Sequence, residues 1–263
     1  MSRRLEEKFT ELARDSRKGL VTFLMGGDPD IATSGRLLAQ LPAAGADILE
    51  IGMPFSDPMS DGPAIQAAGL RALHAGVTLK DIIRLVRQCR EKDATTPIIL
   101  MGYFNPIYVY GIEKFCKDAT AAGADGVILV DLPPEEEKEF ITHAAPHDLK
   151  LIRLAAPTTD DTRFTMLLKN AGGFIYYISV AGITGTKSAD LKPLEARVKS
   201  LKSKTKLPIA VGFGIKTPKQ AAEVAAFSDA VVVGSALVEM VGKGANDTMI
   251  ALVKSLRNAL DAA

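Results

Sequence analysis

Apolar residues in this chain gather in short continuous runs rather than in alternating patterns. Most of these runs are rich in Val, Ile, Leu and Phe and offer apolar side chains to both faces of an extended strand. Strands of this kind are buried on both faces, as in parallel sheets that are covered by helices. The predicted strands are 20–26, 47–52, 97–103, 126–131, 151–156, 174–179, 208–214 and 230–235.

Between these runs lie stretches whose apolar residues recur at helical spacing. Two of them end in the repeated sequence AAGAD, at 43–47 and 121–125, just before the next predicted strand. Glycine in that position is typical of a helix C-cap. The clearest predicted helices are 34–45, 79–92, 112–123 and 218–228.

Strand and helix alternate eight times along the chain. This order favours parallel strands joined by right-handed crossovers. An open, doubly wound sheet is one such arrangement. Eight units in 263 residues agree better with a closed α/β (β/α)8 TIM barrel, for which about 250 residues is typical. Residues 1–19 add a helix at the N-terminus, and no linker or change in composition divides the chain, so we expect a single barrel domain over residues 1–263.

The overall charge gives no sign of a polyanionic partner. Lys and Arg total 32 against 31 Asp and Glu, which argues against nucleic acid or an anionic membrane. Cys89 and Cys116 lie in predicted helices and are expected to be free thiols in a reducing compartment, with a disulfide as the alternative. Residues 1–19 contain no apolar core of the signal-peptide type, and no apolar run approaches ~20 residues, so we expect a cytoplasmic protein.

The second predicted strand runs into a carboxylate, Glu50, and then into a loop that prolines stiffen, EIGMPFSDPMSDGP. Barrel chemistry sits on the loops after the strands, so Glu50 should face the mouth, with Asp57 and Asp61 carried over it. Turn formation is the ordinary role of Asp beside Pro or Gly, and we keep it for Asp57. An ion pair would be the ordinary role of Glu50. For Glu50 and Asp61 we predict catalysis, because a partly buried carboxyl group has a raised pKa and transfers protons near neutral pH.

Small residues follow three strands that would be neighbours in the barrel. Loops after the last strands of such barrels often bind phosphate through backbone N–H groups, together with a helix N-terminus. One glycine pair alone would indicate only a turn, but three adjacent loops make a stronger case. The predicted phosphate ligands are Gly185, Gly214, Gly234 and Ser235.

Other candidate chemistry is weaker. His143 and His147 flank Pro146 in a loop that precedes a strand, at the wrong end of the barrel, and no other His or Cys spacing indicates a metal. We therefore predict no metal site. A Schiff-base aldolase would need a lysine near a strand end, and the candidates, Lys187 and Lys216, both lie in loops beyond the strands.

Several of these segments together resemble the tryptophan synthase α subunit. They are FLMGGDPD, LEIGMPFSDPMSDGPAIQ, MGYFNPIYVYG, GADGVILVDLPPEE, YYISVAGITG, VGFGI and GSALV, in order from about residue 20 to about residue 240. The resemblance implies a barrel lyase of tryptophan biosynthesis that cleaves indole-3-glycerol phosphate to indole and glyceraldehyde 3-phosphate. It also implies no cofactor in this chain. The expected partner is a β subunit in an α2β2 heterotetramer, whose pyridoxal phosphate serves to join indole to L-serine.

The resemblance also implies roles for single residues. Glu50 matches the catalytic acid/base, Asp61 the second catalytic carboxylate, and Tyr176 a tyrosine near the active site. Thr184 matches a threonine of the loop after the sixth strand that contacts the catalytic Asp. Val180 is a departure, because some members carry Arg there, and it bears on loop closure. Phe23, Leu100 and Tyr103 match positions around the indole ring, and Gly185, Gly214, Gly234 and Ser235 match the phosphate loops.

Other functions fit parts of this pattern. An aldolase that uses Lys216, or an isomerase acting on a related sugar phosphate, would share the phosphate loops. A catalytically silent barrel that only regulates a partner would need neither Glu50 nor Asp61. For the β subunit, the resemblance implies docking over the loops 53–62 and 103–111, where Pro54 and Tyr108 are candidate interface residues.

Overall fold

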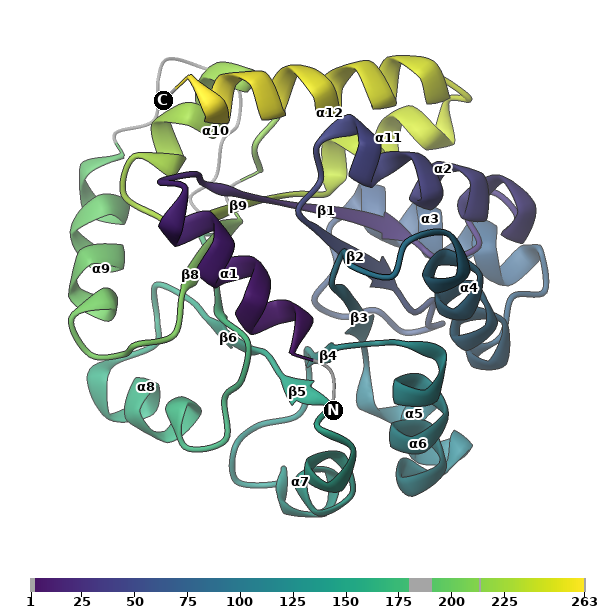
Figure 1. Ribbon diagram of the computed structural model, residues 1–263. Helices are drawn as coiled ribbons and strands as arrows, with labels where there is room; N and C mark the ends of the chain where they lie inside the picture. Colours follow the sequence, from purple (N-terminus) through teal and green to yellow (C-terminus); the bar gives the residue numbers. More distant parts are fainter. Residues whose placement is uncertain (1–2, 180–190, 213, 263) are drawn as a thin grey trace.

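The computed structural model describes residues 3–179, 191–212 and 214–262. Its strands form one parallel sheet in the order β5-β4-β3-β2-β1-β9-β8-β7-β6. The two ends of this order are consecutive in the chain, so the sheet curls into a nearly closed barrel (Figure 1). The predicted TIM barrel is therefore confirmed over the open alternative. The strands are β1 Gly19–Met25, β2 Ile48–Gly52, β3 Ile98–Gly102, β4 Gly126–Leu129, β5 Lys150–Leu151, β6 Arg153–Ala155, β7 Ile175–Ile178, β8 Ile209–Gly212 and β9 Ala230–Val233.

The part of the chain that the structure describes has nine strands rather than eight, because the predicted strand 151–156 is divided at Ile152. The first piece, β5, pairs with β4, and the second piece, β6, pairs with β7. Ile152 itself is buried in the barrel interior, and its N–H bonds the carbonyl of Val127 at 2.9 Å. Both pieces occupy one barrel position, so the expected eight strand–helix units remain.

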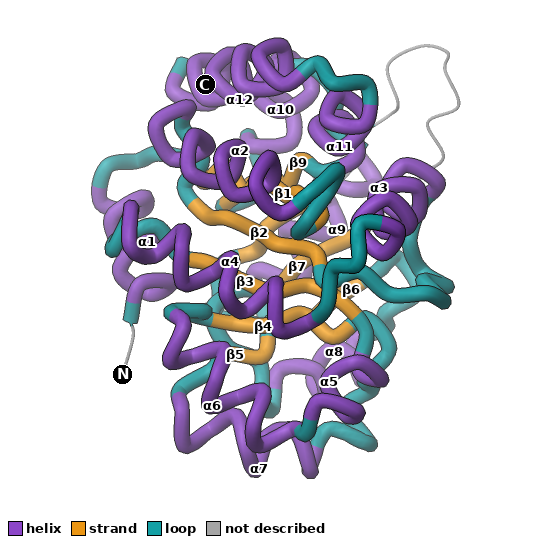
Figure 2. Tube along the Cα trace, turned by 90° about the vertical axis from the view of Figure 1, so that its right-hand side faces the viewer, coloured by secondary structure: helices purple, strands orange, loops and turns teal. Residues whose placement is uncertain are grey.

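Helices surround the strands on the outside (Figure 2), and the four clearest sequence predictions each correspond to one of them. The outer apolar faces of the strands pack against these helices in one large hydrophobic core. None of the helices described is long and apolar enough to cross a membrane. The helices are α2 Ile31–Ala44, α3 Pro63–His74, α4 Leu79–Lys92, α5 Phe104–Tyr110, α6 Ile112–Ala122, α7 Lys138–Ala144, η1 Ala145–His147, α8 Asp161–Leu168, α9 Lys192–Lys202, α10 Pro218–Ala225, α11 Ser235–Gly242 and α12 Asn246–Asp261.

The predicted N-terminal helix, α1 (Arg4–Arg14), lies across one end of the barrel (Figure 1). It inserts Leu5, Phe9 and Leu12 into the cluster that fills the barrel interior. The rings of Phe9 and Phe174 lie 5.6 Å apart in that cluster. This end holds the start of the strands, so the opposite end, where the strands finish, is the one left for chemistry.

Both copies of the AAGAD repeat have the same structural role. Gly45 and Gly123 are the C-caps of α2 and α6, with φ of 109° and 104°, a backbone conformation that favours glycine. Asp47 and Asp125 each accept a backbone N–H of a neighbouring strand at 2.8 Å. Asp47 is also paired with Arg257 of α12 at 2.8 Å, with both side chains buried. The repeat therefore stabilises the start of the strands, away from the mouth.

Candidate active site

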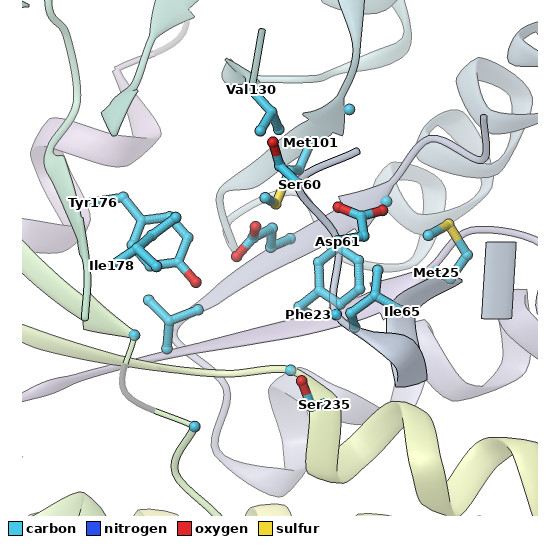
Figure 3. Close-up of a pocket in the computed structure, with 18 of the residues that line it drawn as sticks. Phe23, Met25, Ser60, Asp61, Ile65, Met101, Val130, Tyr176, Ile178 and Ser235 are labelled. Atoms are coloured by element: carbon cyan, nitrogen blue, oxygen red, sulfur yellow. The ribbon is translucent and has the colours of Figure 1, made fainter. Parts of the chain in front are cut away.

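The mouth of the barrel holds a cavity of about 220 Å³, lined by residues from the ends of β1, β2, β3, β7, β8 and β9. Figure 3 shows its walls, with Asp61 beside Phe23 on one side and Tyr176 on the opposite side, its hydroxyl directed inward. Ser235 lies apart from both, at the start of α11. The predicted residues that line the cavity are Phe23, Glu50, Asp61, Tyr103, Tyr176, Gly214, Gly234 and Ser235.

Glu50 lies in the middle of β2 and is turned toward the barrel interior, like Ile48 two residues before it. Phe23 of β1 and Ile99 of β3 are its neighbours in register. The side chain is 1% exposed, and neither carboxylate oxygen has a hydrogen-bond partner among the residues described. Burial without a counter-charge disfavours the ionised form and raises the pKa of Glu50 to about 8. At neutral pH this group holds its proton and can give it to a substrate.

Asp61 reaches the cavity from the loop between β2 and α3. One carboxylate oxygen accepts a hydrogen bond from the Tyr103 hydroxyl at 3.1 Å, and that hydroxyl accepts the N–H of Ser60 at 3.0 Å. The ring of Phe55, in the same loop, lies 5.3 Å from that of Tyr103. Burial raises the pKa of Asp61, and the bond from Tyr103 opposes that shift. The loop is thus tied to Tyr103 at the side chain and at the backbone.

Tyr176 lies on β7 with its hydroxyl directed into the cavity. Desolvation, and then the charge of Glu50, raise the pKa of Tyr176 well above its ordinary value, so the phenol stays neutral and can donate a hydrogen bond. A Cβ at Gly212 would lie 2.6 Å from this ring, so glycine is what lets the ring sit against β8. Tyr176 thereby forms the wall across from Asp61.

The far side of the cavity carries the N-terminus of a helix, a feature that favours an anion. Gly234 is the N-cap of α11 and Ser235 is its first residue, so unpaired N–H groups and the positive end of the helix dipole point toward the cavity. Gly214 lines the same side with φ of 60°, and a Cβ there would meet open space. No lysine or arginine belongs to the described lining of the cavity. An anion held here would depend on backbone N–H groups.

Leu100 is the predicted ring-binding residue that the structure does not bring to the cavity. It is 0% exposed and packs in the core between the barrel and the helices. Its neighbour Met101 lines the cavity instead. Side chains alternate between the two faces of a strand, so Met101 can share the face of Tyr103, two residues on, whereas Leu100 cannot. At this position of the cavity wall the structure therefore places Met101, and the expectation for Leu100 is wrong.

Apolar residues that sequence reasoning missed complete the walls of the cavity. They surround the two carboxyl groups with a dry surface suited to a flat aromatic ring. The alternation along β3 was the available signal for Met101, whereas the others come from strand ends, the loop after β4 and the first turn of α3. The main ones are Met25, Ile65, Met101, Val130 and Ile178.

The remaining candidates can be placed as well, except those outside the residues described, namely Thr184, Gly185, Val180 and Lys187. Lys216 is exposed, does not line the cavity, and has Glu239 at 3.9 Å, which does not suit a Schiff-base lysine. Asp57 is exposed and accepts a bond from Ser56 within its own turn. Both cysteines are free and buried, as expected. No cluster of three His, Cys, Asp or Glu suited to a metal occurs among the residues described.

The fold and the site together define a (β/α)8-barrel protein whose apolar mouth cavity has a buried carboxyl group of raised pKa on one side and the N-terminus of a helix on the other. The family profile described as "Tryptophan synthase alpha chain" matches residues 9–262. The chain therefore belongs to the tryptophan synthase alpha chain family. This confirms the resemblance and, with it, the reaction class, which is carbon–carbon cleavage by a lyase of tryptophan biosynthesis.

Solved structures agree over the whole chain. Tryptophan synthase subunit alpha from Legionella pneumophila is 41% identical, with all of both chains covered and a TM-score of 0.94. A protein from Aquifex aeolicus is 38% identical, with 98% of each chain covered and a TM-score of 0.91. Mycobacterium tuberculosis tryptophan synthase is 33% identical, with 99% of each chain covered and a TM-score of 0.91.

Proposed function

We propose that Glu50 and Asp61 carry out the retro-aldol cleavage of indole-3-glycerol phosphate in this cavity. One observation carries the assignment: the Glu50 carboxyl group is buried in an apolar cavity, has no hydrogen-bond partner among the residues described, and has its pKa raised to about 8. A group in that state is matched to proton transfer near neutral pH.

The chemistry needs one proton to move within the substrate. Protonated Glu50 gives its proton to the ring carbon that bears the glycerol chain, which makes the ring electron-poor. The carbon–carbon bond then breaks, its electron pair returns to the ring, and the neighbouring hydroxyl becomes the aldehyde as its proton passes to the Glu50 carboxylate. Indole and glyceraldehyde 3-phosphate leave, and Glu50 is again protonated.

Asp61 stabilises the positive charge that develops on the ring nitrogen. For this the carboxylate accepts the ring N–H, a charge-assisted bond that strengthens as the ring is protonated. The Tyr103 hydroxyl lowers the pKa of Asp61 against the effect of burial and so favours the anionic form. The apolar lining, including Phe23 and Met101, holds the ring between the two groups.

The phosphate is held at the other end, by N–H groups around Gly214, Gly234 and Ser235. Binding energy from this remote group positions the reacting bond. Thr184 and Gly185 lie outside the residues described, and their roles, contact with Asp61 and phosphate binding, remain part of this proposal.

The product points to a partner. Indole goes to the β subunit, which condenses it with L-serine to give L-tryptophan in an α2β2 assembly. The pyridoxal phosphate belongs to the β subunit, and the α chain carries no cofactor. Three exposed apolar side chains in the predicted partner loops support docking at the mouth. They are Met59, Tyr108 and Val109, which are 77%, 60% and 78% exposed. We place the assembly in the cytoplasm, with residues 1–263 of this chain as one domain.

Indole release from indole-3-glycerol phosphate tests the proposal directly. Glu50→Gln keeps the shape of the side chain and removes its titratable proton, so turnover should fall at least ~10²-fold with substrate still bound. Asp57→Asn, a carboxyl-to-amide change at the exposed turn, should leave turnover near normal. Near-normal turnover in Glu50→Gln would overturn the assignment. Trapping with borohydride should yield no adduct at Lys216, whereas an adduct would favour a Schiff-base aldolase.

A further inference from the structure

An ion pair between a buried aspartate and a half-buried arginine joins two elements at the mouth end of the barrel. Asp28 lies in the loop that follows β1, and its side chain is 2% exposed. Arg71, in the last turn of α3, donates from Nε to one carboxylate oxygen and from Nη2 to the other, each at 2.7 Å. A bidentate pair of this kind fixes both the distance and the orientation of the elements it joins.

The helix that carries Arg71 also holds the catalytic loop. Its N-cap, Gly62, directly follows Asp61, and Gln66 in its first turns donates to the Asp61 carbonyl at 2.8 Å. Ile65 in the same turns lines the cavity. The position of α3 therefore sets where the chain leaves the Asp61 loop.

The same guanidinium group touches the helix of the anion site. A Cβ at Gly242, the last residue of α11, would lie 2.9 Å from Nη2 of Arg71. The cation thus packs against the negative end of the α11 dipole, where positive charge is favourable. The opposite end of α11, with Gly234 and Ser235, faces the cavity. Contacts between α3 and both β1 and α11 complete the connection.

We propose that Arg71 is a positioning residue that fixes the catalytic carboxylate loop relative to the phosphate-binding helix. The inference rests on the proposed function, since it concerns the two ends of that same site. A substrate held at its phosphate and attacked at its ring needs these ends at a constant separation. Misplacement of reacting groups by about 1 Å can cost ~10²-fold in rate.

A matched ion pair lies at the other end of the barrel. Arg257 is paired with Asp47 at 2.8 Å, and this aspartate is buried like Asp28. Arg71→Gln removes the guanidinium bound to Asp28, and Arg257→Gln removes the nearer of two from Asp47, which keeps Arg17 at 3.8 Å, so both should destabilise the fold. Only Arg71→Gln should disturb the site. The comparison separates positioning from stability.

The test measures steady-state indole release and the affinity for glycerol 3-phosphate, at a temperature where circular dichroism shows every variant folded. Arg71→Gln should lower kcat/KM at least tenfold and weaken the binding of glycerol 3-phosphate at least threefold. Arg257→Gln should change each of these quantities less than twofold. Arg71→Lys keeps the positive charge but loses the bidentate contact with Asp28, so its kcat/KM and affinity should lie between those of the wild type and Arg71→Gln. Asp28→Asn should repeat the loss, which keeps the test available if Arg71→Gln does not fold.

Equal effects of Arg71→Gln and Arg257→Gln on both readouts would overturn the inference and leave a purely structural ion pair. Absence of indole release from the wild type would overturn the proposed function instead. The glycerol 3-phosphate titration would still decide the role of Arg71 in that event, because it needs no turnover.

Discussion

The hydroxyl of Tyr103 donates a hydrogen bond to Asp61 at 3.1 Å while it accepts the N–H of Ser60 at 3.0 Å. Tyr103 is 2% exposed, so a rigid residue next to β3 holds a loop that starts from β2. The Asp61 carboxylate is thereby oriented before substrate arrives, which is what the proposed electrostatic stabilisation of a developing charge requires.

Tyr103→Phe tests this orientation by removing the hydroxyl and little else. A hydrogen bond to a charged group contributes about 1.5–3 kcal/mol, so kcat/KM for indole release should fall roughly 10- to 100-fold. The control is Tyr110→Phe, which deletes a comparable bond to Asp118 at 2.6 Å outside the cavity. Tyr110→Phe should release indole at the wild-type rate when both are measured as isolated chains. Equal rates in the two variants would show that Asp61 needs no support from Tyr103.

The raised pKa of Glu50 makes stability depend on pH. The folded-state pKa is about 8 and the ordinary value is 4.5, so between these values the folded protein keeps a proton that the unfolded chain has lost. Stability therefore falls as pH rises through this window, by about 1.4 kcal/mol per pH unit at most. Above about pH 8 the loss in the free energy of unfolding no longer grows with pH.

Urea unfolding of wild type and Glu50→Gln at pH 5, 6.5 and 8 measures this linkage. The variant cannot ionise, so it should become more stable than the wild type as pH rises, with the difference largest near pH 8. A difference that does not vary with pH would mean that Glu50 titrates normally in the folded state. In the same pH series, kcat/KM of the wild type should decline above about pH 8, as the proton donor is lost.

Glycine at position 214 should matter more for phosphate than the lysine beside it. Gly214→Val places a branched side chain where a Cβ now meets open space on the cavity side, so it should weaken glycerol 3-phosphate at least tenfold by exclusion. Lys216→Gln should change the affinity less, because Lys216 does not line the cavity. Isothermal titration compares them.

Backbone strain needs its own control, because Gly214 has φ of 60° and valine is unfavourable there. Gly244 has φ of 71°, also faces open space, and follows the far end of α11. Gly244→Val should therefore cost similar stability and leave the affinity intact. If Lys216→Gln weakened binding more than Gly214→Val, a side-chain cation would hold the phosphate.

The sequence predicted most of the fold because the barrel is encoded in local patterns. Apolar runs separated by amphipathic stretches give parallel strands and covering helices, and the strand ends then place Glu50 and Gly234 at one mouth. The division of the fifth strand at Ile152 was not predictable, since it depends on how β5 and β6 pair with different neighbours.

The details of the site were harder to predict. The resemblance places Leu100 at the ring, but strand alternation turns it away from the cavity, which Met101 lines instead. Two contacts depend on loop conformations and join segments more than 40 residues apart. They are the hydrogen bond from Tyr103 to Asp61 and the bidentate ion pair between Arg71 and Asp28. No local pattern reports such contacts.

The partner should act on α5 and on the loop before α3. Phe104 anchors α5, because its N–H bonds Asp131 at 2.8 Å and its ring packs edge-on against Phe140. Tyr108, one turn later, projects outward and is 60% exposed. A partner that covers Tyr108 and the stretch around Pro54 would favour one conformation of the Asp61 loop. It would thus speed the reaction by shifting a population rather than by adding a catalytic group.

We therefore predict that the isolated chain is a slow monomer that the β subunit accelerates. Tyr108→Asp should abolish the acceleration and leave the slow basal indole release largely intact, because a buried unpaired charge at an interface costs several kcal/mol. Pro54→Asp should act similarly. Thr10→Asp, which adds the same charge on α1 at the opposite end of the barrel, should keep full acceleration. Light scattering with a matched β subunit reports the complex. An isolated chain already at full speed, or a Tyr108→Asp variant that is accelerated like the wild type, would place the docking surface elsewhere.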